Sequence, residues 1–346
     1  MKKAFITGIT GQDGAYLAEL LLRKGYKVIG GERRNASGSL WRLKKLGIEK
    51  RVHITNFELS ELTNINRAIN KYLPDEFYNL ASQSFVQDSF ELPIMTTDIT
   101  GLGVGRILEV LRNTKKKIKF YQASSSEMFG KATETPQKET TPFYPRSPYG
   151  AAKLFGHWLT INYRESYNMF ACSGILFNHE SPLRGEKFVT KKITTALARI
   201  KLGKQDCLRL GNIDSKRDWG FAGDYVEAIY KILQQKKPGD FVISTGKTHT
   251  VRKFVETSAK LLGMKIQWHG SKLNERGIDK KTGKTIIKID RRFFRPAEVD
   301  VLHGDYSRAR KILKWKPKNS FNDLVEMMTI SDYNEQKKIS NNLNNS

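Results

Sequence analysis

Cysteine is scarce in this chain. Its 346 residues include only Cys172 and Cys207, too few for a disulfide framework and at the wrong spacing for a metal-ligand motif. We interpret both as ordinary thiols. The six histidines are scattered, with no His-Glu-x-x-His pattern and no paired cysteines beside them. These absences argue against a zinc site, and we predict no bound metal.

Long apolar runs are also missing. No stretch approaches the roughly 18 consecutive apolar residues that mark a transmembrane helix, so a membrane partner is not expected. The start, Met1-Lys-Lys, resembles the charged beginning of a secretory signal, but Thr, Gly and Asp follow before any apolar region develops. We therefore expect a cytoplasmic protein.

Acidic residues are few relative to basic ones. The chain has 35 Asp and Glu against 60 Lys and Arg, a net charge of +25, and such a surplus can indicate nucleic-acid binding. Here the charge is spread along the chain, and local concentrations such as 115–117 and 280–281 lack interleaved aromatic residues. We expect no nucleic-acid partner, because an anionic small-molecule substrate and a solvated lysine-rich surface account for the surplus.

Short apolar runs alternate with helix-like segments through the first half of the chain. Strands are predicted at 4–7, 27–30, 51–55, 76–80, 118–123 and 170–177, with helices at 16–23, 62–72, 103–112 and from Tyr149. This alternation is typical of βαβ units that build a parallel sheet. The predicted fold class is α/β, with a Rossmann-type doubly wound parallel sheet.

A glycine-rich turn joins the first predicted strand to the first helix. The run Gly8-Ile-Thr-Gly-Gln-Asp-Gly14 follows an apolar strand and opens a helix, the context that a pyrophosphate-binding turn requires. Gly8 would make the turn, Gly11 would let the phosphates approach, and Gly14 would let helix pack on strand. A plain glycine-rich turn is the alternative. We favour a dinucleotide cofactor bound by Gly8, Thr10, Gly11, Gln12, Asp13 and Gly14.

The residues after the second strand bear on which dinucleotide binds. Arg33 and Arg34 stand where an NAD enzyme usually has an acid for the ribose hydroxyls. Two arginines suit a 2′-phosphate, whereas Glu32 would repel it if it pointed inward, so NADP is favoured over a surface role for these charges. Further cofactor contacts are expected where the third and fourth strands end, at Glu58, Leu59, Leu80, Ala81, Ser82, Gln83 and Ser84.

Four residues near the middle of the chain predict the chemistry. Tyr149 and Lys153 lie one helical turn apart, and the lysine charge would favour the phenolate, so Tyr149 could act as a base near neutral pH. Ser125 and Glu127 follow an apolar strand and would add a second base to the same site. A phenol base indicates redox chemistry and a second base indicates dehydration. Ordinary surface roles are the alternative.

The glycine turn, the serine at a strand end and the Tyr-x-x-x-Lys spacing together resemble the extended short-chain dehydrogenase/reductase family. Longer runs narrow the resemblance to the GDP-mannose 4,6-dehydratases within it. These runs are 8–14, 136–153, 175–182, 216–220 and 295–300. The resemblance extends to about residue 318.

This resemblance implies conversion of GDP-mannose to GDP-4-keto-6-deoxymannose and water, with NADP accepting and returning one hydride. It implies that Tyr149 takes the C4 hydroxyl proton and that Glu127 removes the C5 proton and helps the C6 hydroxyl leave. Ser125 would bond the C4 oxygen, and Lys153 would hold the nicotinamide ribose and lower the pKa of Tyr149. The resemblance also puts His179 and Arg184 against the cofactor, although His179 could be a core histidine.

The second half of the chain carries groups that suit a nucleotide-sugar. Arginine forks suit a diphosphate, and a carboxylate suits ribose hydroxyls or a guanine edge. Any single one of these groups could be a surface ion pair. The predicted substrate contacts are Ser84, Ser125, Glu127, Asn178, Lys192, Arg217, Arg295 and Glu298.

The second half is also less regular in pattern. Helices are predicted at 190–202, 225–234 and 251–262, with strands near Leu208 and Phe241 and a polar loop over 271–288. We predict an NADP-binding domain over 1–178, to which later segments return, and a smaller C-terminal α/β substrate-binding part over 179–330. Residues 331–346 are expected to form a polar tail, frayed near its Asn-rich end.

Some positions depart from the family pattern. Position 125 is Ser instead of Thr, Glu58 replaces Asp, Ser82 replaces a smaller residue, and Met95 stands where the family has a cofactor-facing Tyr. The departures leave three alternatives open: a GDP-manno-heptose 4,6-dehydratase, a C4 epimerase or reductase of a GDP-sugar, and a non-enzymatic NADP sensor. The family implies a homodimer or homotetramer with shared contacts near 31–47, and the sequence does not decide between them.

Overall fold

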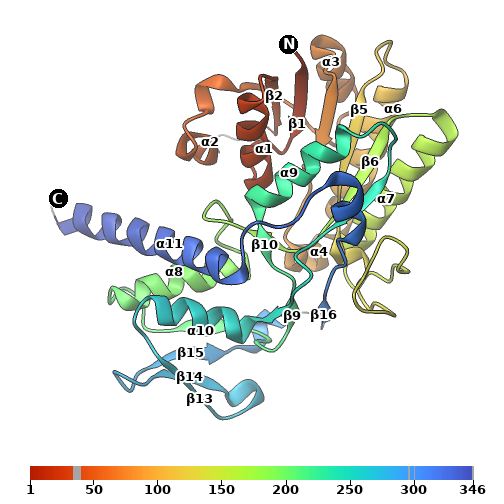
Figure 1. The fold of residues 1–346 in the computed structure, drawn as a ribbon. Helices are drawn as coiled ribbons and strands as arrows, with labels where there is room; N and C mark the ends of the chain where they lie inside the picture. Colours follow the sequence, from red (N-terminus) through yellow and green to blue (C-terminus); the bar gives the residue numbers. More distant parts are fainter. Residues whose placement is uncertain (34–39, 295–296, 300, 345–346) are drawn as a thin grey trace.

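Seven parallel strands form the central sheet of the molecule (Figure 1). The computed structural model describes residues 1–33, 40–294, 297–299 and 301–344, so Arg34 and Arg295 lie outside the described residues. The strand order is β11-β6-β5-β4-β1-β2-β3. The bounds are β1 (Lys3–Thr7), β2 (Lys27–Glu32), β3 (His53–Asn56), β4 (Glu76–Asn79), β5 (Lys119–Ser125), β6 (Ala171–Leu176) and β11 (Asp240–Ile243). The prediction of an α/β fold with a doubly wound parallel sheet is confirmed.

Helices cover both faces of this sheet. One face packs on α1 and α9, and the other on α3, α6 and α7. Alternate strand residues divide between these two cores, because successive side chains of a strand point to opposite faces: Ile6 faces α1, whereas Phe5 stacks on Phe77 on the α3 side. The helices of this part are α1 (Gln12–Arg23), α2 (Trp41–Lys45), α3 (Leu62–Tyr72), α4 (Val86–Glu91), α5 (Pro93–Thr97), α6 (Gly103–Arg112), α7 (Pro148–Tyr167) and α9 (Ala222–Leu233).

A smaller sheet with the order β13-β14-β15-β8 forms the core of the second part. Three helices pack against it and against one another (Figure 1). The elements are β8 (Leu208–Leu210), β13 (Ile266–His269), β14 (Arg276–Asp279), β15 (Thr285–Ile289), α8 (Val189–Lys201), α10 (Val251–Leu261) and α11 (Phe321–Asn344). Two-residue strands pair between the parts, namely β7 (His179–Glu180), β9 (Lys216–Arg217), β10 (Gly220–Phe221), β12 (His249–Thr250) and β16 (Val301–Leu302).

Residues 271–288 form a hairpin where their composition predicts a polar loop. β14 and β15 pair antiparallel across a turn in which Gly283 has φ +69°. Ile286 and Ile287 are buried in the core of the second part, whereas the lysines lie in the turn and on exposed positions. The prediction of a loop was wrong because exposed lysines outnumber the few apolar residues that a half-buried hairpin requires.

The C-terminal segment is helical, in contrast to the frayed tail that its polar composition predicts. α11 continues to Asn344 and extends away from the body of the molecule (Figure 1). Its polar residues include buried partners of α8: the Asp332 carboxylate accepts hydrogen bonds from Lys191, Thr194 and Thr195, and Gln336 accepts one from Arg199. Neither this helix nor any other in the described ranges is long and apolar enough to cross a membrane.

An Asp332→Asn variant should be less stable by about 3 kcal/mol, because the buried Lys191 ammonium would lose its anionic partner. The measurement is urea unfolding followed by circular dichroism, with Glu326→Gln, an exposed position of the same helix, as the matched control. Equal midpoints for the two variants would contradict the expected anchoring of α11 through Asp332.

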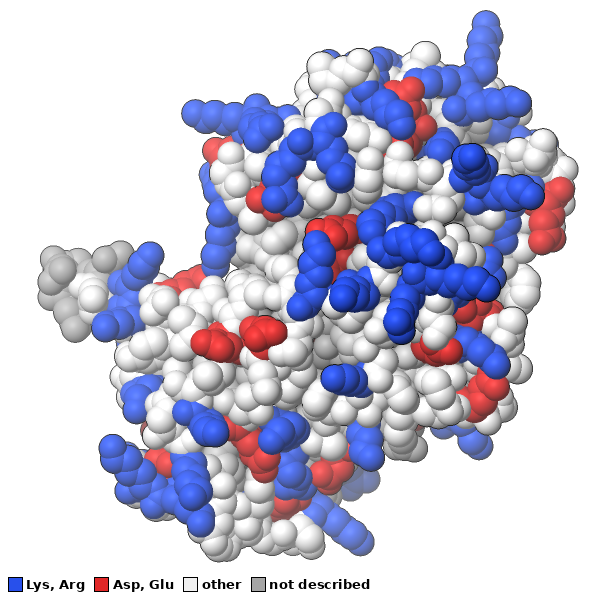
Figure 2. Space-filling model, viewed as in Figure 1, with Lys and Arg blue, Asp and Glu red and all other residues white. Residues whose placement is uncertain are grey.

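Basic side chains are spread over the molecular surface. Figure 2 shows Lys and Arg on both the sheet part and the smaller part, with Asp and Glu among them. Several of these neighbours form ion pairs, for example Lys45 with Glu335 at 3.0 Å and Lys318 with Glu227 at 2.7 Å. The charge surplus is therefore distributed over this face instead of gathered in one block.

Candidate active site

A cleft of about 1640 Å³ lies at the carboxyl ends of the parallel strands. Its walls come from the turn after β1, from the residues that follow β4, β5 and β6, and from α8, β8 and β9 of the second part. Strand order reverses between β1 and β4, and ligands of doubly wound sheets bind outside the carboxyl ends at such a point. The cleft is therefore the candidate functional site.

The glycine turn forms one end of this cleft. Gly8 has φ +68°, and a Cβ on Gly14 would lie 2.3 Å from the Gly8 carbonyl oxygen, so neither position accepts a side chain without rearrangement. Gly11 caps α1 without a side-chain hydrogen bond. The first backbone N–H groups of the helix are open to the cleft, where they suit an anionic group.

A charged pair lies at the start of α1. The two ring nitrogens of His179 lie 2.7 Å from the Asp13 carboxylate and 2.7 Å from the Phe177 carbonyl oxygen. Because both partners only accept hydrogen bonds, the ring donates from both nitrogens and is an imidazolium. Burial opposes this charge, but Asp13 outweighs burial and raises the pKa of His179. The ring also stacks on Tyr225, so His179 is both cleft wall and core residue.

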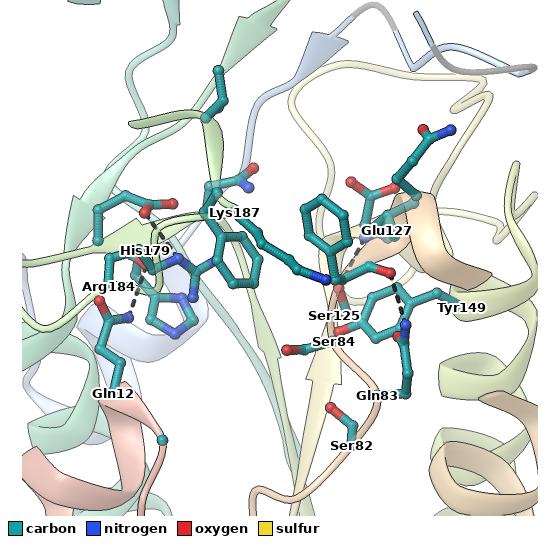
Figure 3. A pocket seen from close by; sticks show the side chains of 18 of the residues that line it. Gln12, Ser82, Gln83, Ser84, Ser125, Glu127, Tyr149, His179, Arg184 and Lys187 are labelled. Atoms are coloured by element: carbon teal, nitrogen blue, oxygen red, sulfur yellow. Dashed lines mark hydrogen bonds and ion pairs between the residues drawn. The ribbon is translucent and has the colours of Figure 1, made fainter. Parts of the chain in front are cut away.

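Ser125, Glu127, Tyr149 and Lys153 come together in one region of the cleft (Figure 3). β5 ends at Ser125, whose hydroxyl accepts a hydrogen bond from the Glu127 backbone N–H at 3.2 Å and so starts the short helix η3 (Ser126–Met128). α7 begins at Pro148 and brings Tyr149 and Lys153 to the same wall. All four residues are buried, so water has little access to them.

Burial governs the protonation of Tyr149 and Lys153. It raises the pKa of Tyr149 to about 12, a rise that a hydrogen bond with Ser125 opposes and the Glu127 carboxylate increases. Burial also lowers the pKa of Lys153 to about 8, and its ammonium donates to the Ala123 carbonyl oxygen at 2.8 Å. The prediction that Lys153 makes Tyr149 a phenolate near neutral pH is therefore wrong for the chain by itself.

The residues predicted to bind the cofactor line the cleft, apart from Arg34, which is outside the described residues. The cleft-lining members are Gly8, Thr10, Gly11, Gln12, Asp13, Gly14, Arg33, Glu58, Leu59, Leu80, Ala81, Ser82, Gln83, Ser84, Tyr149, Lys153, His179 and Arg184. Among the described residues, the buried oxygens Gln83 Oε1 and Asn178 Oδ1 have no hydrogen-bond partner. Both can accept hydrogen bonds from a bound molecule.

The predicted substrate residues lie on the same cleft, again with one outside the described part, Arg295. Those described are Ser84, Ser125, Glu127, Asn178, Lys192, Arg217 and Glu298. Arg217 Nη2 lies 3.6 Å from Glu298 Oε1, and Lys192 Nζ lies 3.2 Å from the ring centre of Phe293. Burial lowers the pKa of Lys192 to about 8, so this lysine is mainly charged at neutral pH.

Sequence reasoning missed several basic and aromatic residues of the cleft. They are Lys187, Phe188, Arg199, Arg209, Arg292 and Phe293. One signal was available: Arg199 follows Lys192 by seven positions on α8, and Thr195 and Ala196 between them line the cleft as well, the spacing of one helical face. The other residues reach the cleft through tertiary packing that no local pattern encodes.

Comparison with known proteins gives a consistent result over most of the chain. A family model described as GDP-mannose 4,6 dehydratase matches residues 5–328. The GDP-mannose 4,6 dehydratase of Homo sapiens is 50% identical over 337 residues, which covers 95% of this chain and 91% of the human one. The GDP-mannose 4,6-dehydratase of Sinorhizobium fredii (strain HH103) is 50% identical over 338 residues and covers 96% of both chains.

Solved structures show the same architecture. RMD from Pseudomonas aeruginosa, solved in complex with NADPH, superposes with a TM-score of 0.76 at 21% identity and covers 97% of this chain and 100% of that chain. At this identity the likeness shows the fold alone.

Proposed function

The chain belongs to the GDP-mannose 4,6-dehydratase family, and from that premise we propose that it converts GDP-mannose to GDP-4-keto-6-deoxymannose and water. One observation carries the proposal: Tyr149 and Glu127 line the same cleft, and the Glu127 charge raises the pKa of Tyr149. A base for a hydroxyl and a base for a neighbouring carbon thus flank one volume, which is the arrangement that a 4,6-dehydration needs.

NADP is the cofactor, and the residues at the glycine-turn end of the cleft suit it. The open N–H groups of α1 suit its pyrophosphate, Arg33 after β2 suits its 2′-phosphate, and the unpartnered Gln83 and Asn178 oxygens accept hydrogen bonds. Arg34 remains a proposed contact outside the described residues. When bound, the oxidised nicotinamide accepts a hydride from C4 of the sugar and delivers it to C6.

Tyr149 takes the proton of the C4 hydroxyl, and Ser125 holds that oxygen. The phenol is the resting form because its pKa is about 12, so positive charge nearby assists its ionisation. Arg184 acts in this direction on the pKa of Tyr149, and Lys153 is held in place by the Ala123 carbonyl oxygen.

Glu127 acts after C4 has become a ketone, because the ketone acidifies the proton on the adjacent C5. The carboxylate takes the C5 proton as the C5–C6 double bond forms and the C6–O bond breaks. It passes that proton to the departing hydroxyl, which leaves as water. C5 finally takes up one proton, which balances the proton that Tyr149 removed from the C4 oxygen.

The nucleotide of the substrate lies toward the second part of the molecule in this proposal. Arg217, with its side chain largely buried, and Lys192 offer positive charge for the diphosphate. Glu298 and Asn178 offer acceptors for ribose hydroxyls or the guanine edge. Arg295 keeps the role that the resemblance implies for it.

The direct test is incubation of purified protein with GDP-mannose, followed by mass spectrometry. Loss of one water from the nucleotide-sugar supports the proposal. A parallel sample with GDP-manno-heptose tests that alternative substrate, and NADP binding without any mass change in either sample would favour a sensor role.

We also propose the division of the chain into an NADP-binding domain over 1–178 with returning segments, a substrate-binding part over 179–330 and a C-terminal segment over 331–346. Two large cores support such a division, one around the central sheet and one around the smaller sheet. A cytoplasmic location belongs to the same proposal, and the two unpaired thiols, Cys172 and Cys207, support it.

Self-association is proposed through an apolar face formed by α5, α7 and the turn before α6. Ile94 is 82% exposed, Trp158 is 55% exposed, and Phe155 and Leu102 are about half exposed on neighbouring elements. A Cβ on Gly101 would lie 3.4 Å from the Phe155 ring, which places the turn beside α7. A two-fold interface needs one such patch on each copy.

A Trp158→Glu variant should therefore shift the protein toward the 39.6 kDa monomer. Light scattering during size-exclusion chromatography measures the mass, and Leu273→Glu, which changes an exposed apolar residue of the second part, is the matched control. An unchanged oligomer in Trp158→Glu would rule out this face.

A further inference from the structure

The guanidinium of Arg42 joins two segments that meet at the cleft. Arg42 lies in α2, its Nε donates to the Leu183 carbonyl oxygen at 2.7 Å, and its Nη1 donates to the Thr10 carbonyl oxygen at 2.9 Å. Thr10 belongs to the glycine turn, and Leu183 precedes the cleft-lining Arg184. One side chain thus connects both sides of the proposed cofactor site from behind.

The contact to Thr10 fixes a peptide unit inside the glycine turn. The carbonyl of the Thr10–Gly11 peptide accepts from Arg42, and the N–H of the same peptide donates to the Gly8 carbonyl oxygen at 2.9 Å. With both ends held, this peptide cannot rotate without breaking a hydrogen bond. Since α1 begins at the next residue, its orientation sets the direction of the first N–H groups of the helix.

The contact to Leu183 closes a second connection. Ser181 donates to Gln12 Oε1 at 2.8 Å and accepts from the Leu183 N–H at 3.0 Å, and Gln12 Nε2 donates to the His179 carbonyl oxygen at 3.1 Å. The segment 179–183 therefore already rests on α1 through Gln12. Arg42 holds its far end and leaves little freedom in the distance between the turn and Arg184.

The charge of Arg42 has a consequence for anions as well. Burial lowers its pKa to about 10, and the Arg184 cation contributes while Asp13 opposes, so the guanidinium is charged at neutral pH. It adds positive potential beside the start of α1, where the helix dipole has the same sign. Both effects favour a diphosphate at the turn.

We propose that Arg42 is a positioning residue for the dinucleotide, which holds the Thr10–Gly11 peptide and the segment before Arg184 at the spacing that the pyrophosphate requires. This inference rests on the proposed function, because it assumes that the cleft binds NADP. A lysine cannot replace the arginine fully, since an ammonium is a point charge without the planar fork that reaches two carbonyl groups in separate segments.

The test compares Arg42→Gln and Arg42→Lys with the wild type and with Lys44→Gln, an exposed position of the same helix. Calorimetric titration gives the Kd of NADP⁺ and, separately, of GDP, and the melting temperature without ligands reports folding. We expect Arg42→Gln to raise the Kd of NADP⁺ by at least about tenfold, Arg42→Lys to fall between, and the Kd of GDP to stay within about twofold. Lys44→Gln should match the wild type.

Two results would overturn the inference while the proposed function stands. One is a folded Arg42→Gln protein whose NADP⁺ affinity equals that of the wild type. The other is an equal loss of NADP⁺ and GDP affinity with a lowered melting temperature, which would make Arg42 a residue of general stability. A wild type that binds no NADP⁺ would instead remove the proposed function, and the inference with it.

Discussion

A Glu127→Gln variant is expected to bind GDP-mannose and NADP but to release almost no water from the sugar. Glutamine keeps the shape of the side chain, and the hydrogen bond between the Glu127 backbone N–H and Ser125 does not depend on the carboxylate. The amide, however, is not basic enough to take the C5 proton. General base catalysis contributes about 10²–10⁴-fold, and we expect a loss near the upper end because the residue is buried and water cannot substitute easily.

Deuterium from solvent water gives the sharpest measurement for this variant. The wild type should place deuterium at C5, and Glu127→Gln should not, although Tyr149 still permits oxidation at C4 and a small amount of reduced cofactor should accumulate. Glu186→Gln, which changes an exposed carboxylate at the same cleft, is the matched control and should behave as the wild type. Wild-type deuterium incorporation in Glu127→Gln would show that another group removes the C5 proton.

A Tyr149→Phe variant should lose the reaction at an earlier step. Without the phenol oxygen nothing at this position takes the C4 hydroxyl proton, so we expect a loss of about 10³-fold or more in turnover and no reduced cofactor at all. The two variants therefore separate the two bases: one still oxidises C4 and the other does not.

The pH dependence gives an independent check on Tyr149. Its pKa of about 12 lies above the working range, so the ionised fraction, and with it the wild-type turnover, should rise as the pH rises toward 8. The small residual turnover of Tyr149→Phe should lack this rise. A residual rate with the same slope as the wild type would assign the titration to another group.

The main elements of the fold follow from local patterns in the sequence. The helix predicted at 62–72 is observed as α3 with the same bounds, because apolar residues at helical spacing bury Ile65, Ala68 and Ile69. Two-residue strands such as β9 and β16 gave no signal, since a period cannot be read from two residues. The hairpin β14–β15 and the end of α11 were misread because their polar residues have specific partners that composition does not reveal.

The candidate site was predictable where chemistry depends on short spacings. The glycine turn and the Tyr149–Lys153 pair are local motifs, and the chain folds them onto one cleft. The phenolate prediction failed because burial decides the pKa of Tyr149, and burial is a property of the whole fold. Arg42 could not be found in advance, since its partners Thr10 and Leu183 lie in two other segments of the chain.

The central sheet is completed late in the chain, and this matters for how the protein is made. The edge strand β11 and the covering helix α9 follow α8 and β8 of the second part in sequence, and Ala309, Leu313 and Trp315 join the same core. During synthesis the earlier strands leave the ribosome with one apolar face uncovered. They stay in that state until the chain has grown past residue 315, a window in which chaperones can bind and in which a stalled or truncated product is prone to aggregate.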